Sequence, residues 1–112
     1  MSGFNEGLGL RREGASVVLD AGAAHEVAPG VVHFAVLATL AEVAAATAAG
    51  GAVVPMTVQL NLLRRARPGR LQGQGRVLHA GRRTAVVEGD VTQDGQLVAR
   101  ATVTFAVLAA PA

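Results

Sequence analysis

The sequence of 112 residues contains no cysteine, lysine, tryptophan or tyrosine, and three phenylalanines are its only aromatic side chains. The lack of cysteine excludes disulfides and thiolate chemistry. With so few aromatics, the core must consist mainly of Ala, Val and Leu, which lets backbones pack closely. All ten basic residues are arginine, yet the formal net charge is only +2. Because this excess is small and stacking aromatics are scarce, we expect no nucleic-acid partner.

The length fits one domain, which we expect to span residues 1–112 with an irregular N-terminal segment over 1–14. An isolated domain of this size buries only a moderate share of its surface, so oligomerisation would stabilise it. We expect no secretory leader and no membrane span, because the most apolar region, residues 31–63, is interrupted by Glu42 and Pro55. A cytoplasmic location follows as the expectation.

Apolar spacing predicts one long helix over residues 33–49, where Gly and Pro are absent and large apolar side chains recur at helical intervals. Two glycines, Gly50 and Gly51, end it. The other side of this helix is rich in alanine, so the helix is apolar all round, as is typical of a buried helix.

Strands are predicted on both sides of this helix. Residues 54–62 alternate apolar and polar side chains, which predicts a strand with one buried face. Asp94-Gly95 is a favoured two-residue hairpin turn. The remaining predicted strands are 16–20, 71–79, 84–92 and 97–108. One strand, a long helix and four strands predict an α+β fold in which an antiparallel sheet wraps around the helix.

Glu42 is the only charged side chain, histidine aside, between residues 31 and 63. Burial disfavours its ionised form and raises its pKa towards the range of a general base. The alternative is that Glu42 reaches water at the edge of the helix or pairs with an arginine.

His33 lies at the predicted start of the helix, where unpaired N–H groups can hold an oxyanion. A capping or packing role is the alternative. His33 and Glu42 are separated by nine positions, about 13 Å along the axis and on nearly opposite faces, so they cannot form a dyad within one chain. His25 and His79 have no companions at metal-ligand spacing, and we expect no metal site.

Residues 30–42, Gly-Val-Val-His-Phe-Ala followed by helix and Glu42, resemble a signature in which G-x-x-H-G-G precedes a helix whose acidic residue lies nine positions after the His. This signature belongs to the PaaI-like acyl-CoA thioesterases of the hotdog-fold superfamily. Residues 57–69, 81–88 and 97–103 resemble that family's later strands, so the likeness covers nearly all of 16–108.

The resemblance implies a hotdog fold whose subunits join edge to edge into homodimers, often homotetramers. It also implies that Glu42 activates or directs the attack on a thioester carbonyl. The backbone N–H of Phe34 would stabilise the oxyanion, and His33 would be a supporting polar residue. These groups would come from opposite subunits. No metal or redox cofactor is implied.

Coenzyme A carries phosphates that guanidinium groups bind well, and Arg64, Arg82 and Arg83 are our candidates for this role. A solvated basic rim beside two turns is the alternative for each. Asn61 interrupts an alternating strand, either because it faces the substrate cleft or because it points outwards.

Three positions differ from the usual family pattern: Val27 replaces an Asn, and Phe34 and Ala35 replace two glycines. We therefore carry two functions. The first is hydrolysis of an acyl-CoA thioester to the free acid and coenzyme A. The alternative is a hotdog protein that binds an acyl-CoA or another apolar ligand without turnover, which a Phe at the entrance would suit.

Overall fold

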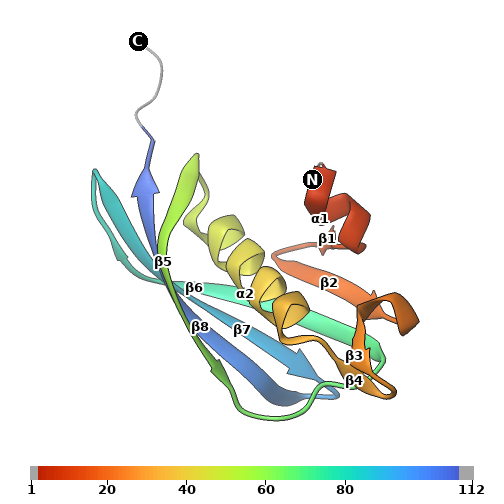
Figure 1. The fold of residues 1–112 in the computed structure, drawn as a ribbon. Coiled ribbons are helices and arrows are strands. Elements are labelled where there is room, and N and C mark those ends of the chain that lie inside the picture. The colour runs from red at the N-terminus through yellow and green to blue at the C-terminus, as the bar shows by residue number, and fades with distance from the viewer. Residues whose placement is uncertain (1–2, 109–112) are drawn as a thin grey trace.

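The computed structural model describes residues 3–108. Six antiparallel strands form one sheet in the order β1-β2-β6-β7-β8-β5, and the long helix α2 lies across one face of it (Figure 1). The predicted α+β architecture is confirmed. The elements are α1 (Gly3–Leu8), β1 (Arg11–Glu13), β2 (Ser16–Ala21), η1 (Ala23–His25), β3 (Glu26–Ala28), β4 (Val31–Val32), α2 (Phe34–Ala49), β5 (Val53–Leu62), β6 (Gly69–Ala80), β7 (Thr84–Gln93) and β8 (Gln96–Val107).

Helix α2 begins one residue later than predicted, with His33 as its N-cap, and ends at Gly50, whose φ of 75° is left-handed. Its inner face packs large apolar side chains such as Leu37 and Leu40 against the sheet. We expected α2 to be buried on all sides, and in the single chain this is wrong for one stripe along the helix. This stripe is exposed or half-buried, and it consists of Ala35, Ala38, Thr39, Glu42, Ala46 and Ala49.

Three glycines of the sheet let the backbone of α2 approach closely. A Cβ atom at Gly89 on β7 would lie closer than 3.0 Å to the carbonyl oxygen of Ala41, and Gly75 on β6 faces Ala44 in the same way. At Gly73 a Cβ would lie 3.1 Å from the Leu40 carbonyl oxygen. The helix is therefore seated on glycine rather than on side chains, as expected for a core poor in large residues.

The hairpins between the later strands agree with the sequence prediction. Asp94 and Gly95, with φ of 51° and 76°, form the two-residue turn between β7 and β8. The N-terminal segment differs from the prediction, because its described residues form α1 and β1 instead of irregular structure. Ion pairs hold β1 in place, among them Arg11 to Asp20 at 2.9 Å and Arg70 to Glu13 at 2.7 Å. The expected loop before α2 contains a short ribbon of β3 and β4.

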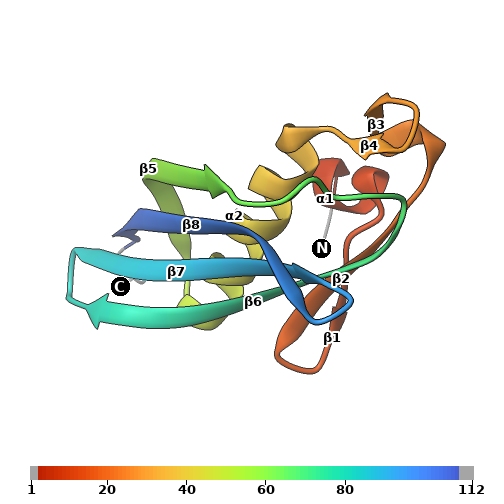
Figure 2. The ribbon, with the colours of Figure 1, turned by 90° about the horizontal axis from the view of Figure 1, so that it is seen from below.

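Strand β5 forms one edge of the sheet and pairs only with β8 (Figure 2). Its predicted buried face is wrong for the single chain. A bulge between Pro55 and Thr57 shifts the alternation, and the edge position leaves Val54, Met56, Val58 and Leu62 46–60% exposed. The alternation of apolar and polar residues therefore belongs to an edge strand whose apolar side chains α2 does not cover.

The seat of α2 on the sheet makes Gly89 intolerant of a side chain. We expect Gly89→Ala to lower the free energy of unfolding by about 3 kcal/mol or more, because the added methyl group meets backbone that cannot move aside. Gly7→Ala is the matched control, since its Cβ would meet nothing within 4 Å. That control should be neutral or stabilising by about 0.5–1 kcal/mol. Equal thermal stability of the Gly89 variant and the wild type would contradict this packing.

Candidate active site

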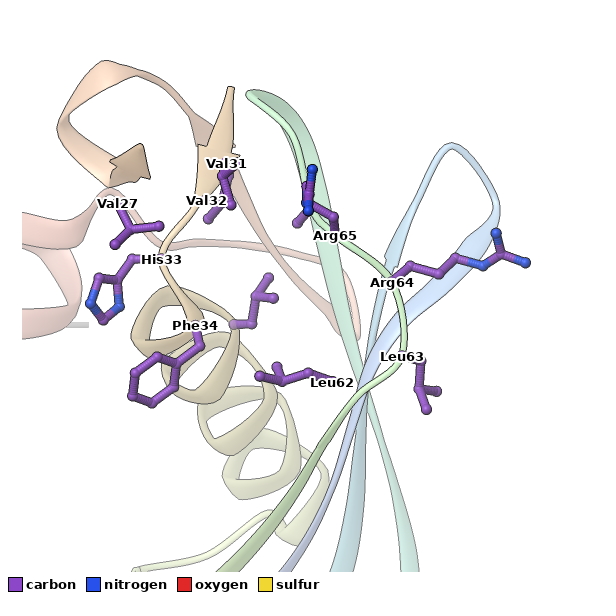
Figure 3. Close-up of a pocket in the computed structure, with 11 residues that line it drawn as sticks. Val27, Val31, Val32, His33, Phe34, Leu62, Leu63, Arg64 and Arg65 are labelled. Atoms are coloured by element: carbon purple, nitrogen blue, oxygen red, sulfur yellow. The ribbon is translucent and has the colours of Figure 1, made fainter. Parts of the chain in front are cut away.

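A cavity of about 460 Å³ opens at the start of α2, between the β3–β4 ribbon and the segment that follows β5 (Figure 3). Its wall is mainly apolar and includes Val31, Leu37 and Leu62. His33 and Phe34 line one side, and Arg64 and Arg65 line the other. Val27, which the sequence resemblance places where the family pattern has an Asn, also lines this space. The cavity therefore combines an apolar wall with polar groups at its rim.

His33 is both the N-cap of α2 and part of the cavity wall. Its Nδ1 accepts a hydrogen bond from the Ala35 N–H at 3.0 Å, and its carbonyl accepts one from Val36 at 3.0 Å. In the neutral ring the proton is consequently on Nε2. The ring stacks on that of Phe34 with centroids 4.9 Å apart. The capping role, weighed as the alternative from sequence, is therefore observed.

This capping leaves the Phe34 N–H without an acceptor among residues 3–108, while the N–H groups of the next two residues are paired. Unpaired N–H groups at a helix start carry partial positive charge. The Phe34 N–H belongs to a residue that lines the cavity. This amide can therefore donate a hydrogen bond to an oxygen that gains negative charge there.

His25 holds the chain that leads into the site, a role that was not predicted from the sequence. Its Nδ1 accepts from the Gly22 N–H at 3.0 Å, and its Nε2 donates to the Leu8 carbonyl at 2.7 Å. Its own carbonyl accepts from the His33 N–H at 2.8 Å. A polar residue in an Ala- and Gly-rich loop was the available signal.

Glu42 is half-buried on the open stripe of α2 and has no hydrogen bond or ion pair with any described residue. Burial raises the pKa of its carboxyl above the ordinary value of 4.5, in agreement with the sequence expectation. Glu42 does not line the cavity of its own chain. Only a second subunit can therefore bring a Glu42 carboxylate to that cavity.

The other predicted site residues lie at three places. Arg64 lines the cavity. Asn61 pairs in register with Arg100 on the outer face of the sheet, away from α2. Arg82 and Arg83 lie in the β6–β7 turn, and the Arg83 carbonyl accepts from Val107 at the opposite end of the sheet (Figure 1). One chain therefore unites His33, Phe34 and Arg64, but not the other four residues.

The segment after β5 is fixed by Gln93, the only buried polar residue among those described. Its amide oxygen accepts from the Arg67 N–H at 3.0 Å, and its amide nitrogen donates to the Arg67 carbonyl at 2.7 Å. Next to it, Ala66 accepts from the Val32 N–H at 3.0 Å. Gln93 was not predicted from the sequence, although a glutamine at an inward position of an alternating strand is a usable signal.

Two classes of feature are not found in the described part of the chain. No three side chains of His, Asp or Glu gather as they would around a metal ion. No helix there has the length and apolar character needed to cross a membrane.

The chain belongs to the thioesterase superfamily, whose family description matches residues 29–100. Its fold is the hotdog fold. The conserved protein PA5202 from Pseudomonas aeruginosa is 31% identical, with a TM-score of 0.89 over 96% of this chain and 95% of that one. No curated protein matches significantly.

The structural neighbours include PaaI-like thioesterases, as the sequence resemblance predicted. A variant of the phenylacetic acid degradation protein PaaI from Thermus thermophilus is 29% identical, with a TM-score of 0.84 over 94% of this chain and 98% of that one. The BH2602 protein from Bacillus halodurans, solved with CoA, is 25% identical, with a TM-score of 0.79 over 88% and 71% of the two chains. Family and neighbours together support a thioesterase.

The raised pKa of Glu42 predicts how its replacement changes stability with pH. Because the pKa of Glu42 is higher in the folded than in the unfolded chain, ionisation of its carboxyl destabilises the fold at pH values above the ordinary pKa of 4.5. Glu42→Gln should therefore raise the free energy of unfolding near neutral pH, and this gain should vanish below the ordinary pKa of 4.5. The gain should be small, since solvent screens a half-buried charge.

Thermal unfolding of the variant and the wild type across this pH range checks the expectation. Glu6→Gln, at an exposed position of α1, is the control and should show no such gain. A loss of stability in Glu42→Gln at neutral pH would mean that the carboxylate has a favourable partner, contrary to this assignment.

Proposed function

We propose that the protein hydrolyses an acyl-CoA thioester to the free acid and coenzyme A. The observation that carries this proposal is the unpaired Phe34 N–H at the start of α2, in the wall of an apolar cavity. A thioester carbonyl that develops negative charge needs such a donor, and its acyl group needs apolar surroundings. Neighbours that include a phenylacetic acid degradation protein and a protein solved with CoA support the same chemistry.

In the proposed reaction, the Glu42 carboxylate acts as a general base and removes a proton from water. The water oxygen attacks the thioester carbonyl carbon, and the Phe34 N–H stabilises the resulting oxyanion. When the C–S bond breaks, Glu42 returns the proton that it took from water to the sulfur, which leaves as the thiol of coenzyme A. Direct attack by the carboxylate is the alternative role of Glu42. His33 holds the first turn of α2 in place and supplies a polar Nε2–H at the rim.

A homodimer joined through β5 would produce this arrangement of groups. The free edge of β5 is ten residues long and carries exposed apolar side chains, which natural proteins cover because it pairs readily with another chain. Two copies of β5 related by a twofold axis run antiparallel, so the Leu62 end of one lies near the Val53 end of the other. The site in one subunit would then receive Glu42 of the partner subunit.

The same dimer gives a role to residues that lie far from the cavity in one chain. The β6–β7 turn lies near the start of β5, because Leu108, next to the Val107 held by this turn, donates to the Ala52 carbonyl at 3.0 Å. Arg82 and Arg83 of the partner subunit would thus approach the site from outside. Asn61, on the outer sheet face, would act at the substrate only through a further subunit contact.

We extend the proposal to assembly and location. The half-open, alanine-rich stripe of α2 suits packing of two dimers into a homotetramer. The absence of cysteine is compatible with a reducing compartment, and we propose the cytoplasm.

The β5 interface predicts that a charge on this edge separates the subunits. Val58→Lys should shift the protein from dimer towards monomer in sedimentation velocity, because a lysine would be forced into an apolar interface. Phe4→Lys places the same change on α1, where Phe4 is 72% exposed, and should leave the assembly unchanged. Dimers of undiminished stability in the Val58 variant would argue for another interface.

The catalytic assignment predicts which variants release free thiol from a panel of short, long and aromatic acyl-CoA substrates. Glu42→Gln should abolish hydrolysis and keep the fold. Because the protein has no cysteine, a thiol reagent reports only released coenzyme A. Full turnover by the Glu42 variant would end the assignment.

The amide of Phe34 can be tested separately from its side chain. Phe34 is the first residue of α2, where proline is well tolerated, and His33 has φ of −62° and ψ of 138°, as favoured before proline. Phe34→Pro should lower kcat by about 100-fold to 1000-fold, since it removes the N–H donor. Phe34→Ala keeps the donor and should retain activity. Equal losses in both variants would assign the effect to the side chain.

The alternative function is binding of an acyl-CoA or another apolar ligand without turnover. Phe34 favours it, because this ring is 56% exposed, stacks on His33 and narrows the entrance that related proteins leave open with glycine. Absence of thiol release across the panel, from folded oligomeric protein that still binds coenzyme A, would establish this alternative.

A further inference from the structure

The segment between β5 and β6 forms the wall between two cavities. It leaves the sheet edge after Leu62, passes the β7–β8 turn and enters β6 at Gly69 (Figure 2). On its inner side lies the apolar cavity of the proposed active site. On its other side lies a second cavity of about 360 Å³. We call this the arginine cavity, and its lining residues are Arg64, Arg65, Arg67, Gln93, Gln96 and Val98.

The backbone that carries these arginines is held at several points. The N–H groups of Leu63 and Arg64 donate to the Val98 carbonyl at 2.9 and 3.2 Å. Both backbone groups of Arg67 bind the buried amide of Gln93. The guanidinium groups thus project from a fixed backbone, which lowers the entropic cost of holding an anion between them.

The arginine cavity is lined by three arginines, and only one of them has an acidic partner among residues 3–108. Arg67 pairs with Asp94 at 3.2 Å, but Arg64 and Arg65 have no acidic partner within residues 3–108. On the outer sheet face, by contrast, Arg76 and Arg100 are paired with Glu88 and Asp90, respectively. Two unpaired guanidinium groups on one short segment are suited to phosphate, which arginine binds bidentately.

The two cavities adjoin at Arg64 and Arg65, which line both. Figure 3 shows the Arg64 side chain extending away from Leu62 and the apolar wall. A ligand that spans both cavities must be apolar at its reacting end and anionic at the other. An acyl-CoA has this distribution, because its thioester and its phosphates are separated by the pantetheine arm.

We propose that the arginine cavity binds the phosphates at the nucleotide end of coenzyme A and thereby selects CoA thioesters over pantetheine thioesters, which lack the nucleotide. The inference rests on the proposed function, because it names how that substrate is recognised. It assigns this role to the subunit that also supplies the Phe34 N–H. Arg82 and Arg83 of the partner subunit are the competing candidates.

Equilibrium binding to the intact oligomer tests the proposal without requiring turnover. Calorimetric titration would compare coenzyme A, dephospho-coenzyme A and pantetheine as probes. The double variant Arg64→Gln and Arg65→Gln should bind coenzyme A about tenfold or more weakly, through loss of charge-assisted hydrogen bonds, and bind pantetheine unchanged. Arg12→Gln, at an exposed arginine of β1, is the matched control and should leave both affinities unchanged.

Three outcomes would overturn the proposal. The first is an affinity for coenzyme A that is the same in the Arg64 and Arg65 variant as in the wild type. The second is a loss of affinity that extends equally to pantetheine. The third is that Arg82→Gln with Arg83→Gln removes the preference for coenzyme A while the Arg64 and Arg65 variant keeps it. If the Arg64 and Arg65 variant binds dephospho-coenzyme A as weakly as it binds coenzyme A, these arginines bind the pyrophosphate. If it loses affinity for coenzyme A alone, they bind the ribose phosphate. Either result supports the proposal.

The readouts separate this proposal from the proposed function. Arginine-dependent binding of coenzyme A without thiol release would retain the arginine cavity and reject hydrolysis. Hydrolysis with the same KM for acyl-CoA in the wild type and in the Arg64 and Arg65 variant would retain hydrolysis and reject the arginine cavity.

Discussion

The contact between the backbone of α2 and the glycines of the central strands fixes the start of the helix, on which the rest of the proposed site depends. Because Gly75 and Gly89 lack side chains, the helix lies directly against β6 and β7 and has little freedom to slide or rotate. Its first turn is consequently held at the mouth of the apolar cavity. The Phe34 amide is therefore oriented by the packing of the whole fold, and not by a flexible loop.

The sheet that packs against the helix leaves β5 as an open edge. The proposed function depends on association of two subunits through this edge. Among residues 3–108, one chain has an unpaired Phe34 N–H at a cavity that no carboxylate lines, and a half-buried Glu42 without a hydrogen-bond or ion-pair partner. A single association through β5 would cover the apolar edge and complete both sites at once. In the proposed dimer, the open edge of β5 explains both why the single chain lacks a complete site and why its subunits associate.

Helical spacing and turn chemistry predicted α2 and the β7–β8 hairpin well, because these features depend on local sequence. The burial of β5 was predicted wrongly for the single chain, since alternation cannot distinguish a strand covered by its own helix from an edge strand that the helix leaves exposed. His33 was proposed from its place at a helix start, and Phe34 from the resemblance to the family signature. The clamp by Gln93 on Arg67 joins positions 26 residues apart, and no local pattern reveals such a pair.

The proposed arrangement is that each site takes its amide from one subunit and its carboxylate from the other. It is tested most directly in heterodimers of Glu42→Gln with Phe34→Pro, isolated through a different tag on each variant. One of the two sites would then carry both intact groups, so thiol release should return to about half of the wild-type rate, although the Glu42 variant alone is inactive and the Phe34→Pro variant alone is slowed about 100-fold to 1000-fold. Heterodimers as inactive as their parents would contradict the account, because both groups would then have to act within one chain.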